Sequence, residues 1–186
     1  FSATTVVNVE EIDLTAANDY KLTLNNATNG SGLFVDGSGL GVGDTLNLNA
    51  AAETTAALKA IGGADNDTIA AGGGADTLDG GLGNDTIGGG AGNDTITGGG
   101  GADTLDGAKG VDTADYSASA SAVTVNLLTN VNTGGDANGD SLSNFENIIG
   151  SASDDKLTGD GLANLIDGGA GKDTIAGGLG IDTVTY

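Results

Sequence analysis

The stretch Gly80-Gly81-Leu82-Gly83-Asn84-Asp85-Thr86-Ile87-Gly88 decides the fold of this chain, because its nine-residue pattern recurs ten times. Six copies follow one another without a gap from Gly62 to Asp115, and four more run from Gly150 to Thr185. A fixed period of this length is typical of a stacked solenoid and not of a globular core. The repeat therefore predicts coils that stack on one another.

Two positions of the repeat carry a nearly constant type of residue. The eighth is apolar, from Ile69 and Leu78 in the first copies to Val184 in the last. The sixth is Asp in every copy but one: Asp67, Asp76, Asp85, Asp94, Asp103, Asp112, Asp155, Asn164, Asp173 and Asp182. Each unit thus supplies one apolar side chain and, with that one exception, one carboxylate.

Glycine at positions one, two and four of the repeat permits positive φ angles and tight turns. We therefore expect a six-residue loop and a three-residue strand in each unit, with two units to one coil. Odd repeats then stack on odd repeats, which places Ile69 over Ile87 and Leu105. Even repeats place Leu78 over Ile96 and Ala114. The predicted fold is all-β, a parallel β-roll or β-solenoid.

The pattern Gly-Gly-x-Gly-x-Asp-x-U-x, where U is a large apolar residue, resembles that of the RTX (repeats-in-toxin) family. Ten units in register carry the resemblance. It implies type I secretion of an unfolded chain. It also implies several calcium ions, each held between equivalent Gly-Asp loops of successive coils by the position-six Asp and by loop carbonyls.

The resemblance implies a specific set of metal ligands. The carboxylates are Asp67, Asp76, Asp85, Asp94, Asp103, Asp112, Asp155, Asp173 and Asp182. The loop glycines are Gly81, Gly83, Gly90, Gly92, Gly99, Gly101, Gly169, Gly171, Gly178 and Gly180. We expect about four ions between the loops of the first block.

The pairing of these carboxylates follows from the stacking of odd on odd and even on even repeats. In the first block it pairs Asp67 with Asp85 and then Asp103, and Asp76 with Asp94 and then Asp112. In the second block it pairs Asp155 with Asp173.

Departures from the pattern predict weaker sites. Asn164 faces Asp182 and brings no charge, so we expect that site to be weak or empty. Asp65 replaces a glycine and Ala71 begins a repeat, which puts the start of the roll in question. Lys109 brings a cation into the loop before Asp112, and we expect it to mark the end of the row.

The composition independently favours calcium. The chain has 26 acidic residues against five lysines, a net charge of −21, and neither His nor Cys. Its candidate ligands are oxygens, which calcium accepts in flexible geometry, whereas zinc and copper prefer His or Cys. A core of about two aliphatic side chains per coil is too thin to fold the chain without metal. The alternative, that the Asp residues only cap turns, predicts no loss of structure when calcium is chelated.

Several classes of function are disfavoured by the same composition. Nucleic acid is excluded as a partner because phosphate binding requires a basic surface. With no His, Cys or Arg and no evident carboxylate pair, we expect no enzymatic activity. No apolar stretch is long enough to span a membrane, so we expect a soluble, secreted chain. Because it starts at Phe1 and stops within a repeat at Tyr186, we expect it to be part of a longer polypeptide that carries any export signal elsewhere.

The sequence divides into four regions. Residues 62–115 and 150–186 form the two repeat blocks, residues 1–61 are expected to form irregular solenoid turns, and residues 116–149 are expected to form wider coils of the same solenoid. Alternating apolar residues predict strands at Val7–Val9, Ile12–Leu14, Leu22–Leu24, Leu33–Val35, Leu46–Leu48, Val123–Leu127 and Asn144–Ile148. Within the last of these, we expect Glu146 to make a structural polar contact or a calcium contact.

Two hypotheses for the function remain open. The first is an extracellular structural or interaction module, such as a surface-layer, adhesin or filament component, which contacts itself or the cell surface. The second is the non-catalytic calcium-binding region of a secreted enzyme or toxin.

Overall fold

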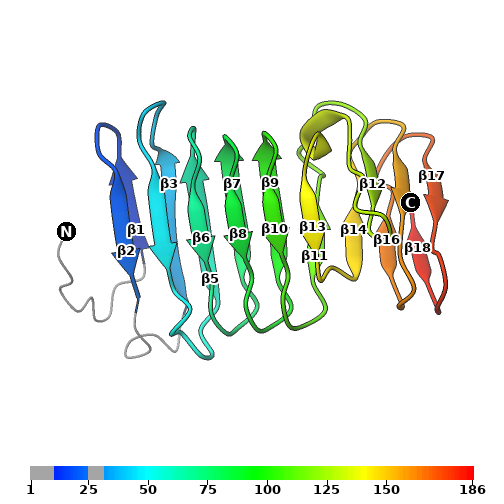
Figure 1. Ribbon diagram of the computed structural model, residues 1–186, viewed down its shortest axis with the longest axis horizontal. Helices are drawn as coiled ribbons and strands as arrows, with labels where there is room; N and C mark the ends of the chain where they lie inside the picture. Colours follow the sequence, from blue (N-terminus) through cyan, green and yellow to red (C-terminus); the bar gives the residue numbers. More distant parts are fainter. Residues whose placement is uncertain (1–10, 25–31) are drawn as a thin grey trace.

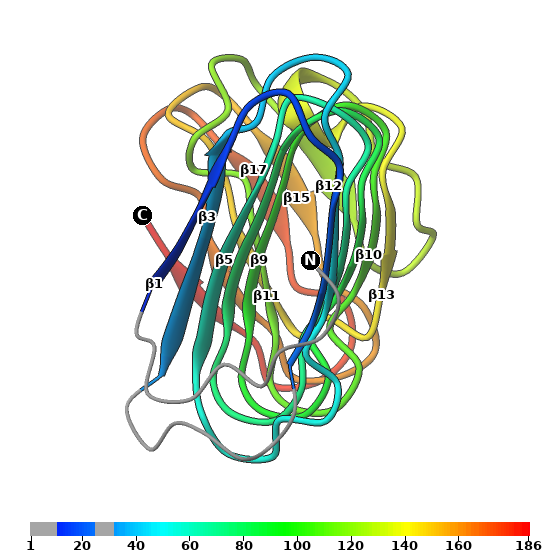
Figure 2. The ribbon, with the colours of Figure 1, turned by 90° about the vertical axis from the view of Figure 1, so that its left-hand side faces the viewer.

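The computed structural model describes residues 11–24 and 32–186. This part of the chain winds into flattened coils that stack along one axis, with β1 and β18 at opposite ends of the stack (Figure 1). Seen from one end, the coils lie behind one another and form two walls of strands (Figure 2). Side chains from both walls fill the space between them. The molecule is therefore all-β and has the architecture of a parallel β-roll.

One wall is a nine-stranded sheet that runs the whole length of the stack. Its strand pairings are all parallel. In order, its strands are β1 (Glu11–Thr15), β3 (Leu33–Gly39), β5 (Leu58–Gly63), β7 (Thr77–Leu82), β9 (Thr95–Gly100), β11 (Thr113–Asp115), β14 (Asn147–Ile149), β16 (Leu165–Asp167) and β18 (Thr183–Thr185).

The opposite wall consists of two shorter sheets, again paired in parallel. The six-stranded sheet holds β2 (Tyr20–Thr23), β4 (Leu46–Asn49), β6 (Thr68–Ala70), β8 (Thr86–Gly88), β10 (Thr104–Asp106) and β13 (Ser141–Ser143). The three-stranded sheet holds β12 (Thr124–Asn126), β15 (Lys156–Thr158) and β17 (Thr174–Ala176). The helical element η1 spans Gly135–Ala137. Within the described residues, no helix is long and apolar enough to cross a membrane.

The core is a double column of position-eight side chains between the walls. In the odd repeats Ile69, Ile87 and Leu105 are register partners, and in the even repeats Leu78 pairs with Ile96 and Ile96 with Ala114. All six are buried. The predicted stacking of odd on odd and even on even repeats is therefore confirmed. It follows from two nine-residue units making one coil, so that each residue pairs with the one eighteen positions away. Position eight faces the core because side chains alternate between the two faces of a strand.

Between the two repeat blocks the chain makes a detour. After β11 it forms β12, returns through η1, and only then forms β13 beside β10. Strand β14 pairs with both β11 and β16, so the nine-stranded sheet continues through this segment. Strand β12 pairs instead with β15 of the following coil. The wall opposite the nine-stranded sheet thus holds one additional strand at this point.

The strands predicted outside the repeats agree with the structure at most sites. Ile12–Leu14, Leu33–Val35 and Leu46–Leu48 lie in β1, β3 and β4, and Leu22 lies in β2. The strand predicted at Val7–Val9 lies outside the described residues. The prediction that a strand begins at Asn144 was wrong, because Asn144 has a φ of 57°. Asn tolerates this left-handed conformation better than most residues, and a three-residue turn precedes β14.

Candidate metal centre

The position-six aspartates of the first block form two rows, one along each edge of the roll. The odd row, Asp67, Asp85 and Asp103, precedes β6, β8 and β10, and the even row, Asp76, Asp94 and Asp112, precedes β7, β9 and β11. The backbone N–H of each Asp donates to Oδ1 of the Asp one coil further on, at 2.7 Å from Asp67 to Asp85 and 2.8 Å from Asp76 to Asp94. The same bond joins Asp85 to Asp103 and Asp94 to Asp112, each at 2.8 Å. The structure thus brings together the pairs that the sequence predicted.

The second oxygen of each of these carboxylates is buried. None of the six Oδ2 atoms has a hydrogen-bond partner among residues 11–24 and 32–186. The side chains are at most 2% exposed, so solvent does not compensate. Burial raises the pKa of all six carboxyl groups above the ordinary 3.8, to about 7 for Asp85 and about 6 for Asp76 and Asp112. A buried carboxylate oxygen of this kind needs a cation or a proton.

The glycine-rich loops stack closely enough to place backbone oxygens between successive coils. A Cβ on Gly99 would lie 1.9 Å from the carbonyl oxygen of Gly81, and a Cβ on Gly101 would lie 1.6 Å from that of Gly83. The φ of Gly99 is 93° and that of Gly101 is 156°. A side chain is excluded at both positions by space and by conformation.

The same relation holds at every glycine predicted as part of a site. Each has a positive φ and lies against a carbonyl group eighteen residues earlier: Gly81, Gly83, Gly90, Gly92, Gly99, Gly101, Gly169, Gly171, Gly178 and Gly180.

At position one of the repeat, a carboxylate oxygen and a carbonyl oxygen approach the same point. A Cβ on Gly80 would lie 2.2 Å from Oδ2 of Asp85 and 2.6 Å from the carbonyl oxygen of Gly98 in the next coil. The glycine leaves this space open. Calcium takes six to eight oxygen ligands from carboxylates, carbonyls and water. The unpaired Oδ2 atoms and the stacked carbonyl oxygens fit that requirement. A calcium ion bound there would neutralise the buried negative charge of the carboxylates.

Turn capping does not account for this geometry. A capping Asp accepts a hydrogen bond from an N–H within its own turn. Here Oδ1 accepts from a residue eighteen positions earlier, in another coil. The carboxylates therefore join neighbouring coils and do not merely close their own loops.

In the second repeat block, Asp155 has hydrogen-bond partners for both of its carboxylate oxygens. The backbone N–H of Asp155 donates to Oδ1 of Asp173 at 2.9 Å, as predicted. However, Oδ2 of Asp155 accepts from the N–H of Ser151 at 2.6 Å, and Ser151 Oγ donates to its Oδ1 at 2.8 Å. Asp173 and Asp182 belong to the last described coil and are half-buried. Asp155 therefore differs from the carboxylates of the first block in that Ser151 supplies a partner for its Oδ2.

Asn164 has a structural role that the sequence did not reveal. Its Oδ1 accepts from the N–H of Asp160 at 2.9 Å, which fixes the orientation of the amide. Its Nδ2 donates to the carbonyl oxygen of Glu146 at 2.9 Å, and its N–H to Oδ1 of Asp182 at 3.1 Å. The preceding coil here presents a carbonyl and not an N–H. An amide satisfies it, whereas a carboxylate would be repelled.

Two acidic residues outside the nonapeptide pattern continue the rows. The N–H of Asp103 donates to Oδ1 of Asp140 at 2.9 Å, and that of Asp112 donates to Oε2 of Glu146 at 2.8 Å. The even row therefore does not end at Lys109, contrary to the prediction. The irregular start expected at Asp65 and Ala71 stays a prediction, because the regular pairing of β5 with β7 concerns the strands and not these loop positions. A structural polar contact or a calcium contact was expected for Glu146, whereas for Asp140 the available clue was its place directly before the polar-apolar-polar triplet Ser-Leu-Ser.

A further carboxylate group lies on the outside of the nine-stranded sheet. Glu11, Asp13 and Asp36 place carboxylate oxygens within 4.8 Å of one another. Glu11 and Asp13 are exposed and Asp36 is half-buried. Unlike the two rows, this group is open to solvent.

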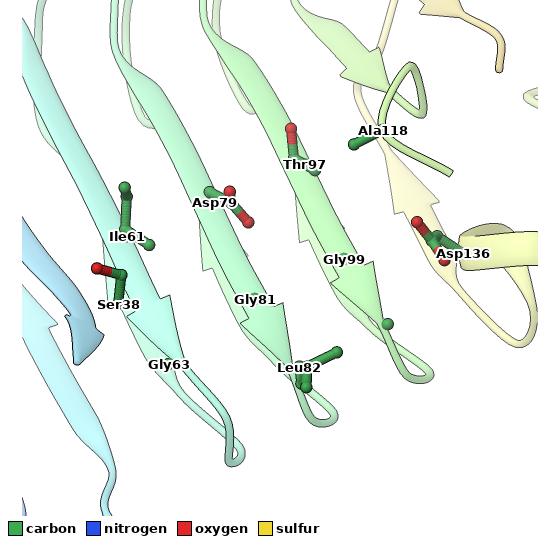
Figure 3. Close-up of a pocket in the computed structure, with 11 residues that line it drawn as sticks. Ser38, Ile61, Gly63, Asp79, Gly81, Leu82, Thr97, Gly99, Ala118 and Asp136 are labelled. Carbon is green, nitrogen blue, oxygen red and sulfur yellow. The ribbon is translucent and has the colours of Figure 1, made fainter. Parts of the chain in front are cut away.

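The outer face of the nine-stranded sheet also carries a shallow groove of about 370 Å³ (Figure 3). Neighbouring strands contribute Gly63, Gly81 and Gly99 to its floor, and Asp79 is its central carboxylate. Burial, with a smaller contribution from Asp115, raises the pKa of Asp79. The hydroxyl-bearing residues Ser38 and Thr97 also line the groove.

The comparison with known families agrees with the geometry. The family model for the RTX calcium-binding nonapeptide repeat matches in four copies, over residues 60–87, 87–114 and 149–184. A search of curated proteins gave no match. The matched residues include both rows of buried aspartates, and their oxygens fit loops that hold calcium. The chain therefore belongs to the RTX family, and it binds calcium between its stacked loops.

Proposed function

We propose that this chain is a secreted, calcium-dependent structural or interaction module that folds outside the cell. RTX proteins are typically exported by type I secretion and are extracellular. Six buried Oδ2 atoms without a hydrogen-bond partner in the described part of the chain carry the proposal. They make the folded state conditional on a cation.

The dependence on calcium follows from electrostatics. The rows place carboxylates one coil apart in a buried environment, within a chain of net charge −21. Their mutual repulsion opposes stacking when no cation is bound, and bound calcium reverses the sign of that interaction. Metal binding then contributes directly to the free energy of folding. A chain of this kind stays unfolded where calcium is scarce, inside the cell, and folds where calcium is abundant.

The proposed task is structural and not catalytic. All strands of the described residues belong to the stacked walls of the roll. Such a roll presents long, regular outer faces, with Thr77, Thr95 and Thr113 in register along the nine-stranded sheet. Regular faces of this kind suit repeated contacts with further copies of the chain or with cell-surface components.

Calcium-dependent assembly provides the test. The molar mass of the chain would be measured by light scattering at increasing protein concentration in calcium, in magnesium and in chelator. The proposal expects a mass above that of the monomer in calcium alone. A strictly monomeric calcium-loaded chain would favour the alternative, a non-catalytic region of a secreted enzyme or toxin. A zinc-protease or lipase motif in the flanking sequence of the full-length protein would favour it further.

A further inference from the structure

We infer that cation binding continues one step beyond the last nonapeptide of the first block. Asp112, Glu146 and the carbonyl oxygen of Asn144 form a further calcium site, which joins the repeat block to the following coil. Glu146 and Asn144 lie outside the residues that match the nonapeptide repeat. The inference rests on calcium binding by the repeats and is independent of the proposed structural task.

The first argument is the state of Asp112. Its side chain is 0% exposed, and its Oδ1 accepts a hydrogen bond from the N–H of Asp94 at 2.8 Å. Its Oδ2 has no hydrogen-bond partner in the described part of the molecule. Asp112 therefore has the same unmet requirement as Asp85 in the middle of its row, although the coil that follows it is not a nonapeptide.

The second argument is the position of Asn144. A Cβ on Gly107 would lie 2.2 Å from the carbonyl oxygen of Asn144 and 2.8 Å from Oδ2 of Asp112. This arrangement matches that at Gly80, where the carbonyl oxygen of Gly98 and Oδ2 of Asp85 approach one point. The left-handed φ of Asn144 turns the chain here in place of a glycine. A carboxylate and a carbonyl oxygen thus converge on the same space as in a repeat site.

The third argument is the choice of Glu at position 146. The turn from β13 to β14 contains three residues, 144–146, whereas the turn from β10 to β11 contains six. The additional methylene of Glu lets its carboxylate reach the N–H of Asp112, at 2.8 Å, from the shorter turn. Glu146 is only half-buried, and it borders a cavity of about 200 Å³ that Ser143 and Asp160 also line. The cavity gives an ion a path to this end of the row.

In the odd row the carboxylate equivalent to Glu146 is satisfied without a cation, although Oδ2 of Asp103 before it has no hydrogen-bond partner in the described residues. The last carboxylate of this row, Asp140, accepts a hydrogen bond from the hydroxyl of Tyr116 at its Oδ2, at 2.9 Å. Tyr116 is 2% exposed, so this bond is protected from water. Tyr116 thus supplies to Asp140 what a cation supplies elsewhere. At the junction, Glu146 and Asp140 occupy equivalent places but need different partners.

The test is the number of calcium ions bound per chain, measured by equilibrium dialysis on the whole chain. Glu146→Gln keeps an oxygen for the N–H of Asp112 but removes the charge. We expect it to bind one ion fewer than the original chain. Glu53→Gln removes a charge outside the rows and is expected to bind the original number.

The outcome is decisive in either direction. An unchanged number of ions in Glu146→Gln overturns the inference, as does an equal loss in Glu53→Gln, which would indicate a general effect of the lost charge. If Glu146→Gln does not fold at saturating calcium, Glu146→Asp replaces it. That variant withdraws the carboxylate by one methylene and should weaken one site by roughly tenfold. Unchanged affinity at every site in Glu146→Asp would equally overturn the inference.

Discussion

The repeat block, residues 62–115, and the segment after it, residues 116–149, build the same kind of coil but satisfy their buried polar atoms differently. The block leaves six carboxylate oxygens without a hydrogen-bond partner in the described structure. In the segment, buried Asp140 accepts from Tyr116, and buried Asn132 donates to the carbonyl oxygen of Asp140 at 3.1 Å. Asn132 also accepts from the N–H of Asn126 at 2.9 Å.

The difference separates two ways of holding a solenoid together. Coils joined through shared ions are stable only where the ion is available. Coils joined by hydrogen bonds between fixed side chains do not depend on the medium in this way. We therefore expect the repeat block to respond to calcium more strongly than residues 116–143, whose buried polar groups are joined by hydrogen bonds.

Removal of calcium should have the largest effect. Chelation is expected to abolish most of the β-strand signal in circular dichroism, because the buried carboxylates lose their counter-charge. Magnesium should restore little of it, since it prefers a rigid octahedral shell. Hydrogen exchange would sharpen the comparison: as calcium falls, peptides from residues 62–115 should lose protection before those from residues 116–143. Full strand content in chelator would contradict the proposed dependence.

Acidification should act on the same block through its carboxylates. Without metal, burial raises the pKa of Asp85 to about 7 and that of Asp76 to about 6, from an ordinary value of 3.8. A raised pKa in the folded state means that the metal-free fold is favoured by protonation and becomes less stable as the pH rises through 6 to 7. Calcium requires the ionised form. The metal-free chain is expected to be unfolded, so protons compete with calcium-driven folding near the ordinary pKa of Asp and not at pH 6 to 7.

Because folding starts from an unfolded chain whose carboxyl groups have ordinary pKa values, the calcium concentration at the midpoint of folding should rise by roughly tenfold between pH 7 and pH 3. Calcium titrations followed by circular dichroism at both values would measure this shift. A midpoint that does not change with pH would show that the buried carboxylates are not the ligands that control folding.

The stacking of loops can be broken at one glycine. Gly99→Ala places a Cβ 1.9 Å from the carbonyl oxygen of Gly81, at a φ of 93°. We expect a loss of roughly 3 kcal/mol in the free energy of unfolding at saturating calcium. Gly88→Ala is the control, because no atom of the described residues outside its immediate neighbours lies within 4 Å of its Cβ position. Urea unfolding would compare them, and equal losses would contradict the close stacking.

The smallest effect is expected at the junction. Tyr116→Phe leaves the buried Oδ2 of Asp140 without the hydroxyl that now donates to it at 2.9 Å. The expected cost is about 1–3 kcal/mol, the usual penalty for a buried acceptor left unpaired. Tyr20→Phe removes a hydroxyl that donates to Thr15 at an exposed site, and should cost less than about 0.5 kcal/mol. Equal urea midpoints for the two variants would show that the hydroxyl of Tyr116 does not stabilise the junction.

The structure of the repeat blocks could be predicted from the sequence because the nine-residue period determines which residues lie next to each other. A spacing of eighteen residues separates every bonded pair in the two rows, from Asp67 with Asp85 to Asp94 with Asp112. The same spacing fixes the partners of Ile87 and Leu78 in the core. Local turn chemistry and long-range stacking agree at these positions, so the residues determine the register.

The junction could not be predicted, because its partners are not one period apart. Asp103 and Asp140 are separated by 37 residues, and Asp112 and Glu146 by 34. The detour through β12 and η1 lengthens the connection, and no spacing rule reveals how far it extends. The contact of the Asn164 side chain could not be predicted for a related reason: its partner, the carbonyl oxygen of Glu146, belongs to this irregular coil.

Strand β12 has a consequence for the wall opposite the nine-stranded sheet. Along the nine-stranded sheet, β11 is followed directly by β14, but on the opposite wall both β12 and β13 precede β15. Strand β13 pairs with β10 and β12 pairs with β15, so this wall is divided into a six-stranded and a three-stranded sheet. Among the described residues, the nine-stranded sheet alone therefore carries an unbroken ladder of backbone hydrogen bonds past the insertion.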